Sequence, residues 1–259
     1  MIHSHPWFYT YSYKKTKKDI FISTFAVALR EGLYLDYIQK QTAPMNQTKF
    51  HPKIDAFWKW FIQMEEHIVT FFEADVDDER ASLIERVNNE VLEFGLFAWE
   101  ISPGTNKPFR FTLSPNGDAK RLALSKLIIS EAPSRLRNWE FYPAKPAKDW
   151  DYILSVYDDW MIERSIEAFR WQYVLLEYSD DTFEVLIQAK NIQFMDEESQ
   201  TAAVDQVLNN VVGEECNINY FTEVSLVDKF PEEYQDISAP IRELKEHFDE
   251  ILAEWQQQV

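Results

Sequence analysis

The sequence predicts an α+β fold: an antiparallel-rich sheet from two ββαβ-like units, helices on one face, an N-terminal helix pair and a C-terminal helix. Three observations predict it. Apolar residues recur with helical spacing in residues 54–95 and 238–257, they alternate along strand-like runs between these regions, and the order strand, strand, helix, strand occurs twice. The chain is 46% hydrophobic, with 19 Phe, 12 Tyr and 9 Trp, which is enough to fill a large core.

The N-terminal helix pair is predicted over residues 45–95. The first helix carries a wide apolar stripe, formed by Ile54, Phe57, Trp58, Phe61, Ile68, Phe71 and Phe72. The second helix can be capped by Asp77 or Asp78 and ends near Gly95. Short connections favour an antiparallel arrangement of the two helices.

The first ββαβ unit follows. Residues 97–101 and 109–113 alternate between apolar and polar side chains, which is typical of two strands joined by the turn at 103–106. Asp118 follows Asn116-Gly117 and caps a helix, and residues 139–144 form the next strand.

The second ββαβ unit has strands predicted at 171–178, 182–189 and 218–227. Its helix begins at Asp196 and ends at Gly213. The similarity between the units lies in the order of the elements and not in residue identity. A terminal helix over 238–257 begins with a proline in its first turn, a position that proline favours.

The sequence divides near Met45. Residues 1–44 contain six Lys/Arg and three Asp/Glu and are rich in aromatics, so their net charge of +3 contrasts with −21 for the rest. One hypothesis is that Met45 is the native start, and that residues 1–44 are a disordered or non-native extension. The alternative is a basic arm that folds onto the acidic body. We expect a single domain over 45–259, divided into a helical pair (45–95), a sheet core (96–230) and the C-terminal helix (238–257).

The net charge of −18 bears on partners. It disfavours phosphate backbones and anionic lipid, so we expect neither nucleic-acid nor membrane binding, and it would attract a basic protein. The apolar stretch at 20–29 is about half as long as a membrane span. Cys216 is the only cysteine, so no internal disulfide forms and a cytoplasmic location is expected.

Two stretches resemble an uncharacterised bacterial protein family. The first combines an Asn116-Gly117 turn, a helix ending in Ala132-Pro133, the strand residues 139–141 and Lys145-Pro146. The second, residues 207–214, looks like the family's Leu-Asp-x-x-Leu-Gly-Glu helix end, with an asparagine where the family has aspartate. The resemblance covers about residues 55–255. It implies a fold and a cytosolic setting, and no activity is assigned to the family.

The motifs of common enzymes are absent from the sequence. The five glycines are far apart, so no phosphate-binding loop exists, and the histidines lack the spacing of metal ligands. Cys216 follows two glutamates, which hinder thiolate formation. We therefore assign no catalytic, cofactor-binding or metal-binding residues, and we expect no cofactor.

Two functions stay open. The sequence favours a non-catalytic interaction or accessory protein, since it combines high acidity with aromatics that could anchor an interface. The alternative is a small-molecule-binding protein or a hydrolase that uses carboxylates in a cleft between the sheet and the helix pair. Trp139, Trp171 and Glu214 are the candidate lining of that cleft.

Overall fold

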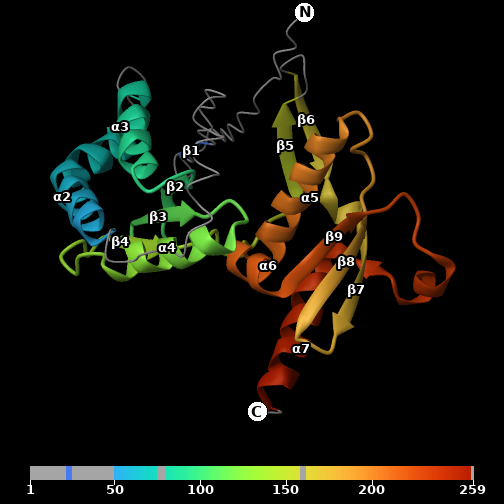
Figure 1. The fold of residues 1–259 in the computed structure, drawn as a ribbon. Coiled ribbons are helices and arrows are strands. Elements are labelled where there is room, and N and C mark those ends of the chain that lie inside the picture. The colour runs from blue at the N-terminus through green and yellow to red at the C-terminus, as the bar shows by residue number, and fades with distance from the viewer. Residues whose placement is uncertain (1–21, 25–49, 75–79, 158–161, 258–259) are drawn as a thin grey trace, which may run out of the picture. The chain divides into compact units, whose positions relative to one another are not determined.

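The structure is a computed structural model, drawn in Figure 1, and it describes most of the chain after residue 49. The described stretches are residues 22–24, 50–74, 80–157 and 162–257. They form two compact units, whose boundary in the sequence lies between Pro143 and Ala144. We call them the N-terminal unit and the C-terminal unit.

The N-terminal unit contains a four-stranded sheet in the order β1-β2-β3-β4 together with three helices. The elements are β1 (Ile22–Thr24), α2 (His51–Ala74), α3 (Arg80–Leu92), β2 (Ala98–Pro103), β3 (Phe109–Ser114), α4 (Ala119–Ser130) and β4 (Trp139–Tyr142).

The C-terminal unit contains a second four-stranded sheet, in the order β10-β7-β8-β9, and the separate hairpin β5-β6. Its strands are β5 (Ile153–Tyr157), β6 (Glu163–Glu167), β7 (Gln172–Tyr178), β8 (Thr182–Gln188), β9 (Phe221–Leu226) and β10 (Ala239–Pro240). Its helices are η3 (Ala168–Arg170), α5 (Glu197–Val212), α6 (Glu214–Tyr220), η4 (Glu232–Ile237), η5 (Ile241–Glu243) and α7 (Leu244–Gln257).

Both four-stranded sheets have the same pattern of strand directions. In the first, β1-β2 and β2-β3 are antiparallel and β3-β4 is parallel. In the second, β10-β7 and β7-β8 are antiparallel and β8-β9 is parallel. The α+β class and the two ββαβ units are thereby confirmed, but each ββαβ unit belongs to its own sheet, whereas the sequence predicted one sheet.

The helices of the N-terminal unit pack on one face of its sheet. Phe57 and Phe61 of α2 meet Phe111 of β3 with ring centroids 6.0 and 5.4 Å apart, and Phe61 lies edge-on to Trp139 at 5.0 Å. The indole N–H of Trp58 donates to the carbonyl of Ile128, which joins α2 to α4. These aromatic rings bury large apolar areas and fix the position of α2 on the sheet.

The C-terminal unit repeats this one-sided arrangement. Helices α5 and α7 share a core with the odd-numbered residues of β7 and β8. Phe183 packs edge-on to Phe248 and stacks on Trp255, both from α7, at 5.4 and 4.8 Å. On the opposite face Phe230 packs against Val174 and Leu186.

The predicted helix starts are confirmed where a side chain caps the backbone. Asp118 and Asp196 are the N-caps of α4 and α5, and each accepts a hydrogen bond from the third helical N–H. Gly213 ends α5 as expected. The predicted cap at Asp77 or Asp78 lies outside the described residues.

Two elements differ from the sequence analysis. Residues 214–220 form helix α6, so the last strand of the second unit begins at Phe221 and not at Ile218. Glu214 and Glu215 lie in the first turn of α6, where negative charge stabilises a helix, and this effect outweighs the strand propensity of the following residues. The hairpin β5-β6 was not predicted.

Little of the predicted segment 1–44 falls within the described residues. The part that does, Ile22–Thr24, is strand β1 and pairs with β2. Both hypotheses for the remainder of this segment concern residues outside the described ranges. The single domain over 45–259 also stays a prediction.

Gly213 is a glycine whose replacement we expect to be costly. Its φ of 89° and ψ of 144° are strained for any other residue, and an added Cβ would lie 3.2 Å from the backbone nitrogen of Ala147. We expect G213A to lower the free energy of unfolding by about 3 kcal/mol. Gly117 is the matched control: its φ is 73° but its Cβ would meet nothing, so G117A should cost about 1 kcal/mol. Urea unfolding measures both, and equal losses would contradict this account.

Candidate functional site

The face of the first sheet that lies opposite the helices is polar. Successive strand residues point to opposite faces, so the residues between the core positions share this surface. We call it the polar face; its members are Glu100, Ser102, Arg110, Thr112, Ser114, Glu140 and Tyr142. Four of them are buried, since Glu100 is 4% exposed and Ser102, Thr112 and Ser114 are each 1% exposed. A buried row of this composition is unusual because polar groups lose free energy when they leave water.

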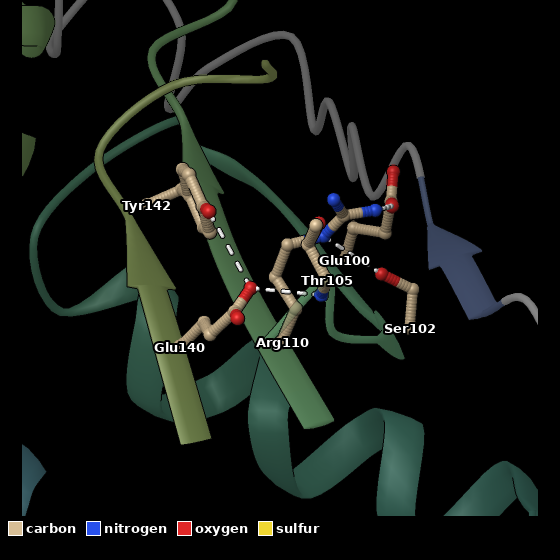
Figure 2. Close-up of polar contacts among 6 residues, drawn as sticks. All are labelled: Glu100, Ser102, Thr105, Arg110, Glu140 and Tyr142. Atoms are coloured by element: carbon tan, nitrogen blue, oxygen red, sulfur yellow. Dashed lines mark hydrogen bonds and ion pairs between the residues drawn. The ribbon is translucent and has the colours of Figure 1, made fainter. Parts of the chain in front are cut away.

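Arg110 lies at the centre of the polar face (Figure 2). Its Nε donates to Ser102 Oγ at 3.1 Å, and its Nη2 lies 3.7 Å from Glu100 Oε1. The guanidinium is also 5.8 Å from the ring centroid of Tyr142. Arg110 therefore links three strands, because Ser102 and Glu100 belong to β2 and Tyr142 belongs to β4.

Glu100 is a buried carboxylate whose loss of hydration is only weakly balanced by protein contacts. Its side chain is 6% exposed, and the ion pair with Arg110, at 3.7 Å, is longer than a hydrogen bond. A carboxylate that leaves water normally needs several close donors to balance the loss of hydration. Glu100 thus has acceptor capacity that the described residues leave unused.

Thr112 lies directly opposite Glu100 on β3. Its Oγ1 is buried and has no hydrogen-bond partner within the described residues. The same strand register therefore places an unpaired hydroxyl beside the carboxylate of Glu100. Together they form the least satisfied polar pair of the polar face.

Glu140 has the opposite character, because its carboxylate is well satisfied. It accepts hydrogen bonds from the backbone N–H groups of Thr105, Asn106 and Lys107, with distances of 3.0 Å for the first and last. Partial burial by itself would raise the pKa of Glu140, but these three donors and the Tyr142 hydroxyl lower it below its ordinary value. Glu140 consequently fixes the turn between β2 and β3.

The three predicted cleft residues are all buried. Trp139 is fully buried in the core of the N-terminal unit, and Trp171 is fully buried in that of the C-terminal unit, where its indole donates to the carbonyl of Lys190. Glu214 is 1% exposed and belongs to the C-terminal unit. The cleft itself stays a prediction.

Glu214 has a structural task. Its Oε2 accepts from the backbone N–H of Lys145 at 3.0 Å, and its own N–H donates to the carbonyl of Lys145 at 2.8 Å. The backbone N–H of Lys148 donates to the carbonyl of Asn210 at 2.8 Å. The Gly-Glu motif at the end of α5 therefore clamps the first residues of the C-terminal unit onto its helices.

Cys216 is half-buried in the C-terminal unit. Burial raises the pKa of its thiol, and the neighbouring Glu215 raises it further, against a smaller opposite effect of Lys245. A thiol in this environment is mostly protonated at neutral pH and is a poor nucleophile.

Among the described residues, no group of three His, Cys, Asp or Glu side chains is arranged to hold a metal ion. His247 is exposed, and its Nδ1 lies 3.0 Å from the hydroxyl of Tyr173. Burial, followed by the charge of Glu243, raises the pKa of Tyr173 to about 12, so this phenol stays protonated.

A second surface lies on the outer face of the second sheet. We call it the acidic–tyrosine surface and define it by Tyr178, Glu184, Glu223 and Tyr234. The hydroxyl of Tyr178 donates to Glu184 at 2.8 Å, and Glu184 is aligned with Glu223 on β9. Hydrogen bonding to Glu184 is the main cause that raises the pKa of Tyr178, and Tyr234 and Glu223 add to it through their charges. These residues therefore lie close together at one end of the sheet.

Sequence reasoning missed both surfaces, although a signal existed. The strands were recognised from their apolar positions, and no role was assigned to the residues between those positions. Glu100 and Arg110 occupy such positions on adjacent strands, and so do Tyr178 and Glu184. Their spacing shows that they share a face once the register is known, but the register itself is set by tertiary pairing.

No family model, curated protein or solved structure matches the chain. The resemblance to the bacterial family therefore rests on its two motifs alone. A separate finding concerns membranes: none of the helices in the described residues is both long and apolar enough to cross one.

Thr112 and Ser102 should respond in opposite ways to loss of their hydroxyls. T112V removes an unpaired buried hydroxyl and keeps the shape of the side chain, so we expect the free energy of unfolding to rise by about 1 kcal/mol. S102A removes the oxygen that accepts the hydrogen bond from Arg110 Nε, and it should lower the free energy of unfolding by about 1 kcal/mol. Denaturant titration of both variants measures the two signs. A destabilised T112V would show that its hydroxyl has a partner.

Glu140 should make stability depend on pH. Its pKa is lower in the folded state, so its contribution is full at neutral pH and is lost as the pH falls through that lowered pKa. We expect E140Q to lower the free energy of unfolding by about 1 kcal/mol at neutral pH. The difference from wild type should vanish in acid. E85Q, at an exposed position of α3, is the control and should follow the wild type at every pH. A constant deficit of E140Q across the titration would refute the assignment.

Proposed function

We propose that the protein is a non-catalytic interaction protein whose C-terminal unit binds a basic segment of a partner protein. The observation that carries the proposal is the acidic–tyrosine surface. Tyr178 is 46% exposed and is held in place by its hydrogen bond to Glu184. Glu223, on β9, is exposed and is aligned with Glu184 on β8. An ordered aromatic ring next to two carboxylates suits a lysine or arginine, which can contact the ring and pair with a carboxylate.

The coverage of the outer face supports this location. Residues 227–238 cross the second sheet and pack Phe230 and Tyr234 on its apolar middle. They leave Tyr178 exposed at the end of the face, and Ile237 of η4 is 58% exposed. Large exposed apolar groups next to charged ones are typical of interaction sites.

Two carboxylates that are occupied by structural hydrogen bonds support a role without catalysis. Glu140 accepts hydrogen bonds from the backbone N–H groups of residues 105–107, and Glu214 accepts one from the backbone N–H of Lys145. Each thus fixes a segment of chain and has little capacity left for proton transfer. The thiol of Cys216 is held in its protonated form by burial and by acidic neighbours.

The charge of the whole chain supports a basic partner. A net charge of −18 attracts a cationic protein over distances longer than a contact and repels nucleic acid. The single cysteine supports a cytoplasmic location as part of the same proposal.

Charge reversal on the acidic–tyrosine surface tests the proposal. We expect E184K/E223K to lose, by at least about tenfold, the affinity for the basic protein that wild type retains from a native extract at low salt. E250K/E254K is the matched control, because it changes the net charge equally on exposed positions of α7, against the other face of the sheet. Affinity capture followed by titration of the captured protein measures the effect. Equal loss in both variants would show that only net charge matters, and no loss in either would refute the surface.

A further inference from the structure

The strand β9 forms one edge of the second sheet. It pairs with β8, and no described strand lies on its other side. An edge strand presents unpaired backbone N–H and C=O groups, and most proteins protect such an edge with lysine, proline or a very short strand. The opposite edge of this sheet is protected, since β10 has two residues and one of them is Pro240. Strand β9 has six residues and contains neither lysine nor proline.

The backbone of β9 shows which groups point outward. The N–H of Val227, just beyond the strand, donates to the carbonyl of Ile187 on β8 at 2.9 Å. Backbone groups alternate in direction along a strand, so those of Ser225 also face β8, and those of Val224 and Leu226 face away from it. Val224 and Leu226 therefore each present an N–H donor and a C=O acceptor at the outer edge.

The side chains of β9 define what could lie beside it. Glu223 lies on the outer face of the sheet, next to Glu184 of the acidic–tyrosine surface. Leu226 is aligned with Ile187 on the other face and is 38% exposed. A strand beside β9 would thus have one face near carboxylates and the other near an exposed leucine.

We propose that the partner adds an extended segment to the outer edge of β9, and that the side chains of this segment alternate between basic and apolar. The inference rests on the proposed function and specifies its mode. Backbone hydrogen bonds to Val224 and Leu226 would hold the segment, as in other cases of strand addition. Its basic side chains would lie near Glu223 and Glu184, and its apolar side chains near Leu226.

A defined peptide tests the inference. The probe is an acetylated and amidated eight-residue peptide that alternates valine and lysine. We expect it to bind the full chain at low salt and to slow amide exchange at Val224 and Leu226, as measured by NMR. L226P removes the outward N–H of Leu226 and should weaken binding at least fivefold relative to L226A, which loses the same contact but keeps the N–H.

The outcomes separate the two proposals. If L226P binds like L226A, and neither amide is protected, but E184K/E223K loses binding, then strand addition is wrong and the acidic–tyrosine surface still stands. If E184K/E223K also binds like the wild type, both proposals fail, as they do if the peptide does not bind the wild type. Should L226P be unfolded by circular dichroism, amide protection in the wild type decides the matter. A dimer of the free protein that L226P abolishes would show that β9 pairs with a second copy of the chain, and would overturn the basic partner.

Discussion

In both four-stranded sheets the helices cover one face, and the pleat of the strands sends every second side chain to the other face. This constraint determines where function can reside, because the helix-covered faces are occupied by packed aromatic rings. Phe111 and Trp139 pack in the core of the N-terminal unit, and Phe183 packs in that of the C-terminal unit. Among the described residues, this leaves the opposite faces of the sheets, the strand edges, the loops and the outer surfaces of the helices for other contacts.

The two units differ in the sheet face that lies opposite their helices. In the C-terminal unit that face is apolar in its middle, and residues 227–238 of the same unit cover it. In the N-terminal unit it is the polar face, with Glu100 and Arg110 joined across strands. An apolar face needs a cover to be stable in water, and it specifies that cover only by shape. A polar face specifies its contacts through directional hydrogen bonds, and it loses free energy wherever one is missing, as at Thr112.

The sequence predicts the elements of this fold better than their assembly. Caps such as Asp118 and Asp196 act on their own helix, so local sequence is enough to find them. The alternation that reveals a strand is also local, and it located β2, β3, β7 and β8. Pairing is different, because it depends on which strand edges meet. The expectation of one sheet failed for this reason. Trp139 and Trp171 were nominated by residue type and not by register; each is buried in the core of its own unit, and the cleft stays a prediction.

The same distinction explains why an edge such as β9 escapes notice in the sequence. Phe221–Leu226 contains apolar and polar residues in an ordinary order, and nothing in it marks the strand as the last of a sheet. Its position becomes visible only when β8 is known to pair with it on one side. Backbone groups at an edge bind any extended chain, so they supply affinity without selectivity. Selectivity has to come from neighbouring side chains, and in the proposed complex Glu223 and Glu184 would provide it on one face and Leu226 on the other. An unprotected edge in a chain of net charge −18 is also shielded from pairing with its own copies, because the approach of two such surfaces is opposed by repulsion that a basic segment does not experience.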